Sequence, residues 1–239
     1  MSEEEKYLRK YLKKENLTQG LEELSRGRSV QYIVGNVDFY GNIINVDERV
    51  LIPRFETELL VEKTAEFIKQ IFENGNIRIV DLGTGSGCIA ISLKKLFMNS
   101  EVYGIDKSLD ALKCASYNAT ENNVNINFSY GDMAEFRDMS FDVYISNPPY
   151  IAYDEVIMDV VKDNEPEMAL YAPDNGLFYY KKIIENLCKL KGKFLIAFEI
   201  GEKQADSIVN IIFKYFTNVT ICIEKDYNKR DRFIFVYRN

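Results

Sequence analysis

The chain has 239 residues, 46% of them hydrophobic, which is enough for one full α/β domain with a small appendage. Its net charge of −7 and pI of about 4.9 argue against a stable nucleic-acid partner, because domains that grip nucleic acids usually present a basic face. Histidine is absent, so a histidine base, nucleophile partner or metal ligand is excluded.

The first fifty residues are predicted to form an N-terminal unit of short helices and a β-hairpin. Residues 3–24 can make one or two short helices. Strands at 37–40 and 43–46 flank Gly41-Asn42, a plausible two-residue turn. We therefore divide the chain into an N-terminal unit, residues 1–50, and a main domain, residues 51–239.

The main domain begins with a predicted helix over Glu56–Asn74, one face of which would pack on a sheet. Arg54, Glu56 and Thr57 stand at its start. Glu56 and Thr57 can cap the helix and Arg54 can pair with an acid, so these residues need no further role.

A glycine loop follows the apolar strand at 79–82. The run Gly83-Thr84-Gly85-Ser86-Gly87 leads into a helix that starts near Ile89. Glycines permit positive φ and let a ligand approach the backbone closely. A dinucleotide fingerprint would need a glycine where Cys88 stands, so the spacing favours a smaller nucleoside cofactor. A tight strand-to-helix turn is the alternative interpretation.

Two more strands end in acidic residues. Asp106 ends the strand at 101–106 and is placed to accept the two hydroxyls of a ribose; Ser108 can cap the next helix in its stead. The strand at 125–130 leads to Asp132 and Met133. Asp132 is placed to accept from an adenine amine and Met133 to pack on the ring, or both belong to an ordinary turn.

The most informative stretch is Asn147-Pro148-Pro149-Tyr150, which follows a buried strand at 141–146. The Asn147 side-chain oxygen and a backbone carbonyl can accept the two hydrogens of a planar NH₂ group. The prolines supply no competing N–H, and Tyr150 can lie against the planar group. We predict that these four residues are catalytic.

Three further strands complete the predicted sheet, at 193–200, 219–223 and 233–237, with helices at 177–190 and 202–216. The last two strands are joined by a charged stretch with no helical pattern, which indicates a reversed final strand. The sequence thus predicts a doubly wound, mostly parallel α/β sheet.

The order of these motifs resembles the class I methyltransferases that use S-adenosylmethionine, and more narrowly the peptide chain release factor glutamine methyltransferases. Similar segments lie at 31–35, 50–61, 165–170 and 175–177, so the resemblance extends from about Arg26 to the C-terminus. It implies a seven-stranded sheet and S-adenosylmethionine bound by Gly83 to Gly87, Asp106, Met133 and Asn147. It also implies that Asn147 to Tyr150 hold the glutamine of a Gly-Gly-Gln motif in class I release factors.

The chain departs from this family at three places. Phe55 and Val30 stand where prolines are usual, and only about 25 residues precede the match, where the family commonly has a larger helical domain. We therefore expect release-factor docking to be weaker or built differently. The resemblance also admits a contact of Arg54, Glu56 or Thr57 with cofactor or substrate.

Other activities remain open at this stage. The acceptor could be an adenine in DNA or a glutamine in a ribosomal protein, although no insert is large enough for a DNA-reading domain. A non-catalytic cofactor-binding protein and a nucleotide-dependent oxidoreductase are the further alternatives. The glycine spacing disfavours the oxidoreductase.

The composition also bears on location and assembly. The widely spaced cysteines Cys88, Cys114, Cys188 and Cys222 suggest neither a zinc site nor disulfides. No apolar run reaches about 18 residues, and the acidic N-terminus is unlike a signal peptide. We expect a cytoplasmic monomer without metal or membrane contact.

Overall fold

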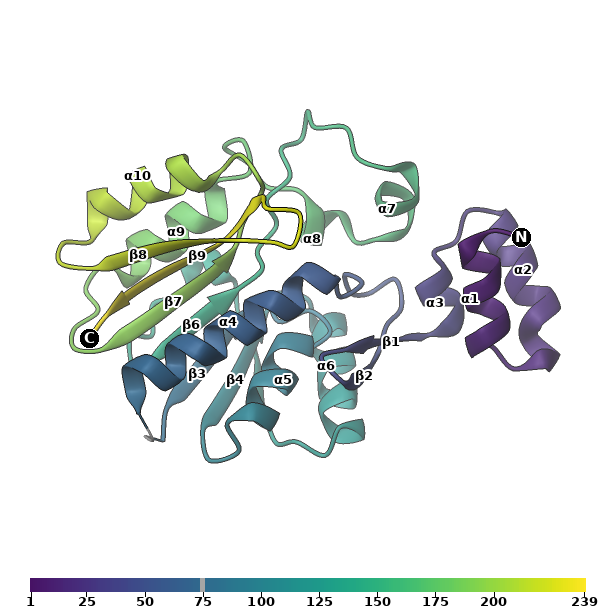
Figure 1. Ribbon diagram of the computed structural model, residues 1–239, viewed down its shortest axis with the longest axis horizontal. Coiled ribbons are helices and arrows are strands. Elements are labelled where there is room, and N and C mark those ends of the chain that lie inside the picture. The colour runs from purple at the N-terminus through teal and green to yellow at the C-terminus, as the bar shows by residue number, and fades with distance from the viewer. Residues whose placement is uncertain (74–75) are drawn as a thin grey trace.

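A mostly parallel sheet forms the centre of the molecule (Figure 1). The computed structural model describes residues 1–73 and 76–239, and within these the sheet has seven strands in the order β5-β4-β3-β6-β7-β9-β8. Neighbours run parallel up to β7, whereas β9 is antiparallel to both β7 and β8. The strands are β3 (Arg78–Leu82), β4 (Glu101–Asp106), β5 (Asn127–Tyr130), β6 (Val143–Ser146), β7 (Phe194–Glu199), β8 (Thr220–Lys225) and β9 (Asp231–Arg238). The predicted doubly wound sheet with one reversed strand is confirmed.

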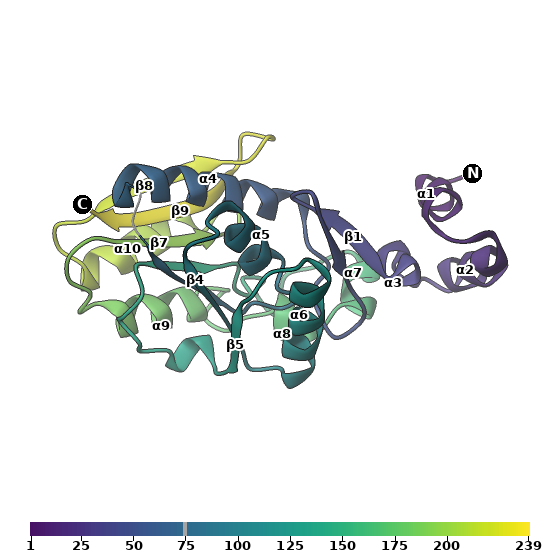
Figure 2. The same cartoon turned by 90° about the horizontal axis from the view of Figure 1, so that it is seen from below.

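Helices cover both faces of this sheet. Figures 1 and 2 show α4, α5 and α6 on one side and α9 and α10 on the other, with α7 and α8 beyond the strand ends. In the main domain the helices are α4 (Phe55–Phe72), α5 (Cys88–Leu96), α6 (Leu109–Glu121), α7 (Asp159–Asn164), α8 (Glu167–Leu170), α9 (Phe178–Leu187) and α10 (Ala205–Tyr215). The helix predicted over Glu56–Asn74 is therefore present, and its last predicted residue lies outside the described residues.

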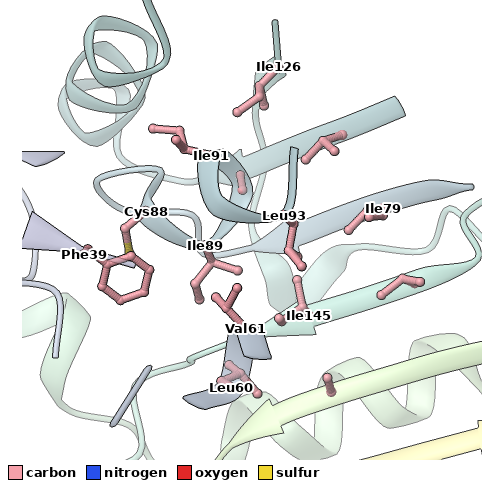
Figure 3. Packing of buried hydrophobic residues seen from close by; sticks show 14 of the residues in the cluster. Phe39, Leu60, Val61, Ile79, Cys88, Ile89, Ile91, Leu93, Ile126 and Ile145 are labelled. Atoms are coloured by element: carbon pink, nitrogen blue, oxygen red, sulfur yellow. The ribbon is translucent and has the colours of Figure 1, made fainter. Parts of the chain in front are cut away.

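Two apolar cores hold the layers together. Ile79 and Ile145 pack with Leu60 and Val61 of α4 and with α5 on one face, as Figure 3 shows. Val80 points to the opposite face, into the core beneath α9 and α10. Successive residues of a strand point to opposite faces, so a strand covered on both sides must be apolar throughout. This explains the unbroken hydrophobic run that precedes the glycine loop.

The N-terminal unit stands at one end of the molecule. Figures 1 and 2 show α1 (Glu3–Tyr11) and α2 (Leu17–Ser25) projecting away from the sheet, with α3 (Val30–Val34) leading back to it. Leu8 of α1 is fully buried, and a Cβ on Gly20 of α2 would lie 3.8 Å from Leu8 and 3.2 Å from Ile33 of α3, so the three helices pack on one another. Two helices, α1 and α2, lie where one or two were predicted, and the structure adds α3 after them.

The hairpin turn was predicted one residue too late. Strands β1 (Asn36–Phe39) and β2 (Asn42–Asn45) are joined by Tyr40 and Gly41, both at positive φ (52° and 72°). A two-residue turn of this kind requires positive φ at both central positions. Asn42 belongs to the strand instead, because it is buried and its Nδ2 donates to Ser92 Oγ of α5 at 3.1 Å.

Candidate active site

A cavity lies at the carboxyl ends of β3 and β6, where the sheet reverses its winding order. This is the position at which open α/β sheets bind their ligands. The cavity wall draws on the loops after β3, β4, β5 and β6. Six of the predicted site residues line it, namely Gly83, Gly85, Asp106, Met133, Asn147 and Pro149. The structure therefore brings together residues that are separated by more than sixty positions in sequence.

The glycines form the floor of this first cavity. Gly83 and Gly85 have positive φ (78° and 55°). A Cβ on Gly83 would lie 2.3 Å from Met133 Cε, whereas one on Gly85 would meet nothing within 4 Å. Gly83 therefore allows Met133 to approach the loop, and Gly85 leaves open space for a ligand.

Asp106 ties the glycine loop to the next helix. Its Oδ2 accepts from the Gly85 N–H at 2.9 Å and its Oδ1 from the Ser108 N–H at 2.8 Å. Ser108 caps α6, as predicted, by accepting from the Ala111 N–H at 3.1 Å. Each carboxylate oxygen can accept more than one hydrogen bond, so this anchored side chain can still accept ribose hydroxyls.

Four predicted cofactor residues do not line the cavity. Thr84, Ser86 and Gly87 are the buried members of the glycine loop, and the Asp132 Oδ1 accepts from the Ala134 N–H at 2.8 Å. The Thr84 hydroxyl donates to Asp81 Oδ2 at 2.7 Å. Asp81 is fully buried, and this burial raises its pKa to about 7. Cofactor contacts by these four residues stay predictions.

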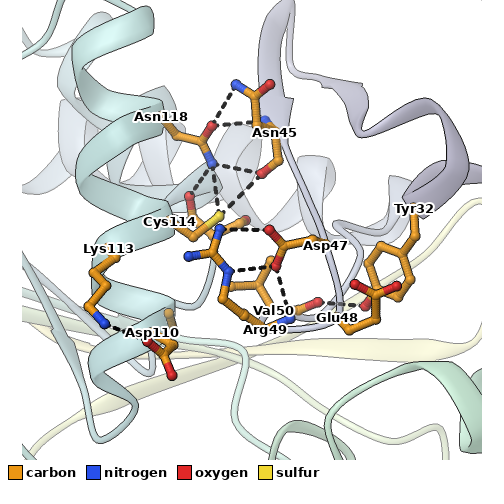
Figure 4. Close-up of polar contacts among 12 residues, drawn as sticks. Tyr32, Asn45, Asp47, Glu48, Arg49, Val50, Asp110, Lys113, Cys114 and Asn118 are labelled. Carbon is orange, nitrogen blue, oxygen red and sulfur yellow. Dashed lines mark hydrogen bonds and ion pairs between the residues drawn. The ribbon is translucent and has the colours of Figure 1, made fainter.

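Asn118 of α6 lines neither cavity but supports the glycine loop, a role that the sequence did not predict. Its Nδ2 donates to the Ser86 and Asn45 carbonyls, both at 2.9 Å, and its Oδ1 accepts from the Asn45 N–H at 2.8 Å. Figure 4 shows this side chain reaching from α6 to Asn45 of the hairpin. Asn118 thus joins the glycine loop to the hairpin, although an asparagine inside a helix gives no signal of that role.

A second cavity adjoins the first. It is lined by Pro148 and Tyr150, by Arg54 and Glu199, and by apolar residues of the segment that leads to α7. Asn147, Leu51 and Ala169 line both cavities. Asn147 therefore stands where the two cavities meet, and the predicted catalytic residues divide between them.

The loop that carries Asn147 to Tyr150 is held by backbone contacts. Gln204 Nε2 donates to the Tyr150 carbonyl at 2.9 Å, and the Ala172 N–H donates to the Ile151 carbonyl at 2.9 Å. A Cβ on Gly176 would lie 2.0 Å from the Tyr150 carbonyl oxygen. The segment at 170–177 thus packs closely against the loop.

The residues at the start of α4 also have partners. Arg54 pairs with Glu165, a buried carboxylate that accepts from the Ile52 N–H at 3.1 Å. Asn147 Nδ2 donates to Thr57 Oγ1 at 3.2 Å, and this hydroxyl donates to Glu199 Oε2 at 2.7 Å. The alternative that Arg54 pairs with an acid is correct. Glu199 was missed, although a charge at the end of a buried apolar strand could have marked it.

Comparisons with known proteins agree with this geometry. Residues 57–165 match the methyltransferase small domain. A release factor glutamine methyltransferase from Bacillus subtilis is 38% identical over 87% of this chain and 75% of its own length. Another, from Thermodesulfovibrio yellowstonii, is 42% identical over 88% of this chain and 76% of its own.

The chain belongs to the release factor glutamine methyltransferase family. Its fold is that of class I methyltransferases. A crystal structure of magnesium protoporphyrin IX methyltransferase from Synechocystis PCC 6803 with bound SAM superposes with a TM-score of 0.54 over 100% of this chain and 99% of that chain, at 16% identity. Among the described residues no helix is long and apolar enough to cross a membrane, and no cluster of metal-ligating side chains occurs.

As a release factor glutamine methyltransferase, the enzyme uses S-adenosylmethionine, and the first cavity fits this cofactor. The open space above Gly85 and the anchored Asp106 carboxylate suit a nucleoside. Met133, whose side chain lies against Gly83, offers an apolar surface for a flat ring.

Changing Gly83 to alanine should weaken cofactor binding by about tenfold or more. The added Cβ would push Met133 Cε away from the loop, and positive φ strains any residue other than glycine by about 1 kcal/mol. Calorimetry with S-adenosylhomocysteine measures the effect. Gly192→Ala is the matched control, because Gly192 also has positive φ (70°) and its Cβ would meet nothing within 4 Å. Equal affinity in the two variants would remove Gly83 from the cofactor site.

Proposed function

We propose that this enzyme transfers a methyl group from S-adenosylmethionine to the side-chain amide nitrogen of the glutamine in the Gly-Gly-Gln motif of class I release factors. The observation that carries the proposal is the position of Asn147 on the walls of both cavities. A donor in the first cavity and an amide in the second would meet at this side chain. The acceptor is the one for which the relatives are named, a release factor glutamine.

The second cavity offers acceptors for a carboxamide. Asn147 Oδ1 can accept one hydrogen of the substrate NH₂ group, and a carbonyl between Asn147 and Pro149 can accept the other. Neither Pro148 nor Pro149 has an N–H that would compete for these carbonyls. Tyr150 packs beside them in a partly buried position, and this desolvation raises its pKa and keeps its phenol neutral.

These acceptors address the poor nucleophilicity of an amide nitrogen. Accepting both hydrogens raises the electron density on the nitrogen and stabilises the positive charge that develops there. When bound, S-adenosylmethionine supplies a methyl carbon on a sulfonium, and the carbon–sulfur bond breaks as the nitrogen–carbon bond forms. The methylated nitrogen then loses one proton to solvent, which restores a neutral amide. Positioning dominates such a reaction, and no histidine is needed.

The surface beside the second cavity favours a polypeptide over DNA. Val156 and Met158 are 95% and 70% exposed, and Ile157 and Met158 line the cavity. Acidic residues accompany them, namely Asp154, Glu155 and Asp159. Such a surface repels a phosphate backbone and suits a basic polypeptide with apolar side chains.

We further propose that residues 1–50 form a docking unit for this partner, and that the enzyme acts as a cytoplasmic monomer.

A methyl-transfer assay with radiolabelled S-adenosylmethionine tests the proposal. Release factor, a ribosomal protein and adenine-containing duplex DNA are offered separately, together with a release factor in which the motif glutamine is replaced by alanine. We expect label on the intact release factor and none on the alanine variant. Label on DNA or on the ribosomal protein would instead identify that molecule as the methyl acceptor. Tight binding of S-adenosylhomocysteine without label on any acceptor would indicate a non-catalytic binding protein.

A further inference from the structure

We propose that Thr57 and Glu199 are positioning residues that set which end of the Asn147 carboxamide faces the substrate. This inference rests on the proposed role of Asn147. The three side chains come from different elements, since Thr57 lies in the first turn of α4, Glu199 ends β7 and Asn147 follows β6. They form one hydrogen-bonded chain, with Asn147 Nδ2 donating to Thr57 at 3.2 Å and Thr57 donating to Glu199 at 2.7 Å.

The direction of donation along these two hydrogen bonds follows from the number of hydrogens that each group has to donate. A carboxylate can only accept, so the one hydrogen of the Thr57 hydroxyl is committed to Glu199. The Thr57 oxygen can then only accept from Asn147, and the carboxamide must turn its NH₂ group toward it. The Asn147 oxygen is thereby left at the other end, available for the substrate NH₂ group.

An inverted carboxamide would defeat the proposed chemistry. It would place two oxygens against each other at Thr57 and would present an NH₂ group to the NH₂ group of the substrate. The two orientations have the same shape, so packing alone cannot choose between them. Thr57 and Glu199 are each only 2% exposed, so water does not compete for these bonds. Among the described residues, no cation pairs with the Glu199 carboxylate, so the hydrogen bond from Thr57 offsets part of the cost of burying it. We call the hydrogen-bonded chain of Asn147, Thr57 and Glu199 the relay.

Substitution of Thr57 can test the orientation of the Asn147 carboxamide without changing the packing around residue 57. Thr57→Val keeps the shape and removes the hydroxyl, and we expect it to lower kcat by about 10- to 100-fold, the size expected for a lost hydrogen bond to a charged group. The KM for release factor and the Kd for S-adenosylhomocysteine should change by no more than about threefold, because the cavity walls keep their form. Thr57→Ser restores the hydroxyl and should recover kcat to near the parent value.

Thr64→Val is the matched control. Thr64 lies in the same helix and is fully buried, and its hydroxyl finds no hydrogen-bond partner among the described residues. This variant should keep the parent kcat. A Thr57→Val enzyme with a kcat within about twofold of Thr64→Val would overturn the inference. If Asn147→Ala is itself fully active, the proposed function fails together with the relay, so the two failures are distinguishable.

The pH profile gives a second readout. Burial raises the pKa of Glu199 to about 7, against the opposing effect of its hydrogen bond from Thr57. Protonated Glu199 can donate to Thr57, which frees the Thr57 hydrogen to turn toward Asn147 and reverses the relay. At saturating cofactor and substrate, kcat should therefore rise as pH increases through about 7. The charged and titratable groups that face Glu199 are Arg54, Glu56, Cys88, Tyr150, Tyr180 and Arg232.

Glu199→Gln decides the origin of this pH dependence. Glutamine cannot change its charge, so the rise in kcat near pH 7 should disappear. Asp81 also has a pKa raised to about 7, but it lies under the glycine loop, so its titration would alter the affinity for cofactor. Persistence of the rise in Glu199→Gln would overturn the inference, even if Thr57→Val fails to fold.

Discussion

Asn147→Ala is expected to lower kcat by about 10²- to 10³-fold, which is the typical loss when one preorganised group that stabilises developing charge is removed. The alanine variant retains the backbone carbonyls at Asn147 and Pro148 but loses one of the two acceptors for the substrate NH₂ group. The amide nitrogen then keeps more of its delocalised character, and the barrier to methyl transfer rises. Single-turnover kinetics with radiolabelled cofactor measures this loss without interference from product release.

The binding steps should respond far less than the chemistry. Asn147 is one of many residues that line the first cavity, and Gly83, Asp106 and Met133 remain in place, so S-adenosylhomocysteine should still bind Asn147→Ala. Asn125→Ala serves as the control, because Asn125 is exposed and lies ahead of β5, outside both cavities. Turnover of Asn147→Ala close to that of Asn125→Ala would contradict the assigned role. If Asn147→Ala loses both cofactor binding and turnover, the first cavity has instead collapsed in this variant.

The sequence predicted the elements that depend on local pattern. The apolar run of β3 before Gly83, the acid at the end of β4 and the Asn-Pro-Pro-Tyr run after β6 each follow from short-range rules about strands and turns. Because parallel strands end at one edge of a sheet, these motifs could be expected to meet there. The first cavity shows that Gly83, Asp106, Met133 and Asn147 do meet.

Contacts between distant segments could not be predicted in the same way. Glu199 is 142 positions from Thr57, and Asn118 is 73 positions from Asn45, so no spacing in the sequence relates them. The hairpin turn was misplaced for a similar reason, because the side chain of Asn42 is taken by Ser92 of α5. Local turn preference favoured Gly41-Asn42, whereas tertiary packing selected Tyr40-Gly41.

The second large effect is expected from Gly176, which touches neither cavity. Its Cβ would lie 2.0 Å from the Tyr150 carbonyl oxygen and 2.5 Å from Gln204 Nε2, distances that real side chains do not allow. The Tyr150 carbonyl is backbone and cannot rotate away, so Gly176→Ala must force apart the loop that carries Asn147 to Tyr150 and the segment at 170–177, and we expect the loop to move. A displacement of about 1 Å at a reacting group can lower the rate by about 100-fold. We expect a loss of kcat/KM of at least about that size.

Backbone strain alone cannot account for such a loss, and comparison of Gly176 with Gly192 tests this. Gly176 and Gly192 both have positive φ (79° and 70°), so alanine at either position should lower the free energy of unfolding by about 1 kcal/mol. Only Gly176 adds a collision with the loop, since a Cβ on Gly192 would meet nothing within 4 Å. Thermal denaturation and steady-state kinetics of the two variants separate these contributions. If kcat/KM falls in Gly176→Ala while Gly192→Ala keeps the parent value, the position of the Asn147–Tyr150 loop controls the rate. Equal kinetics in the two variants would mean that this loop tolerates displacement and that its close packing against the segment at 170–177 has no catalytic consequence.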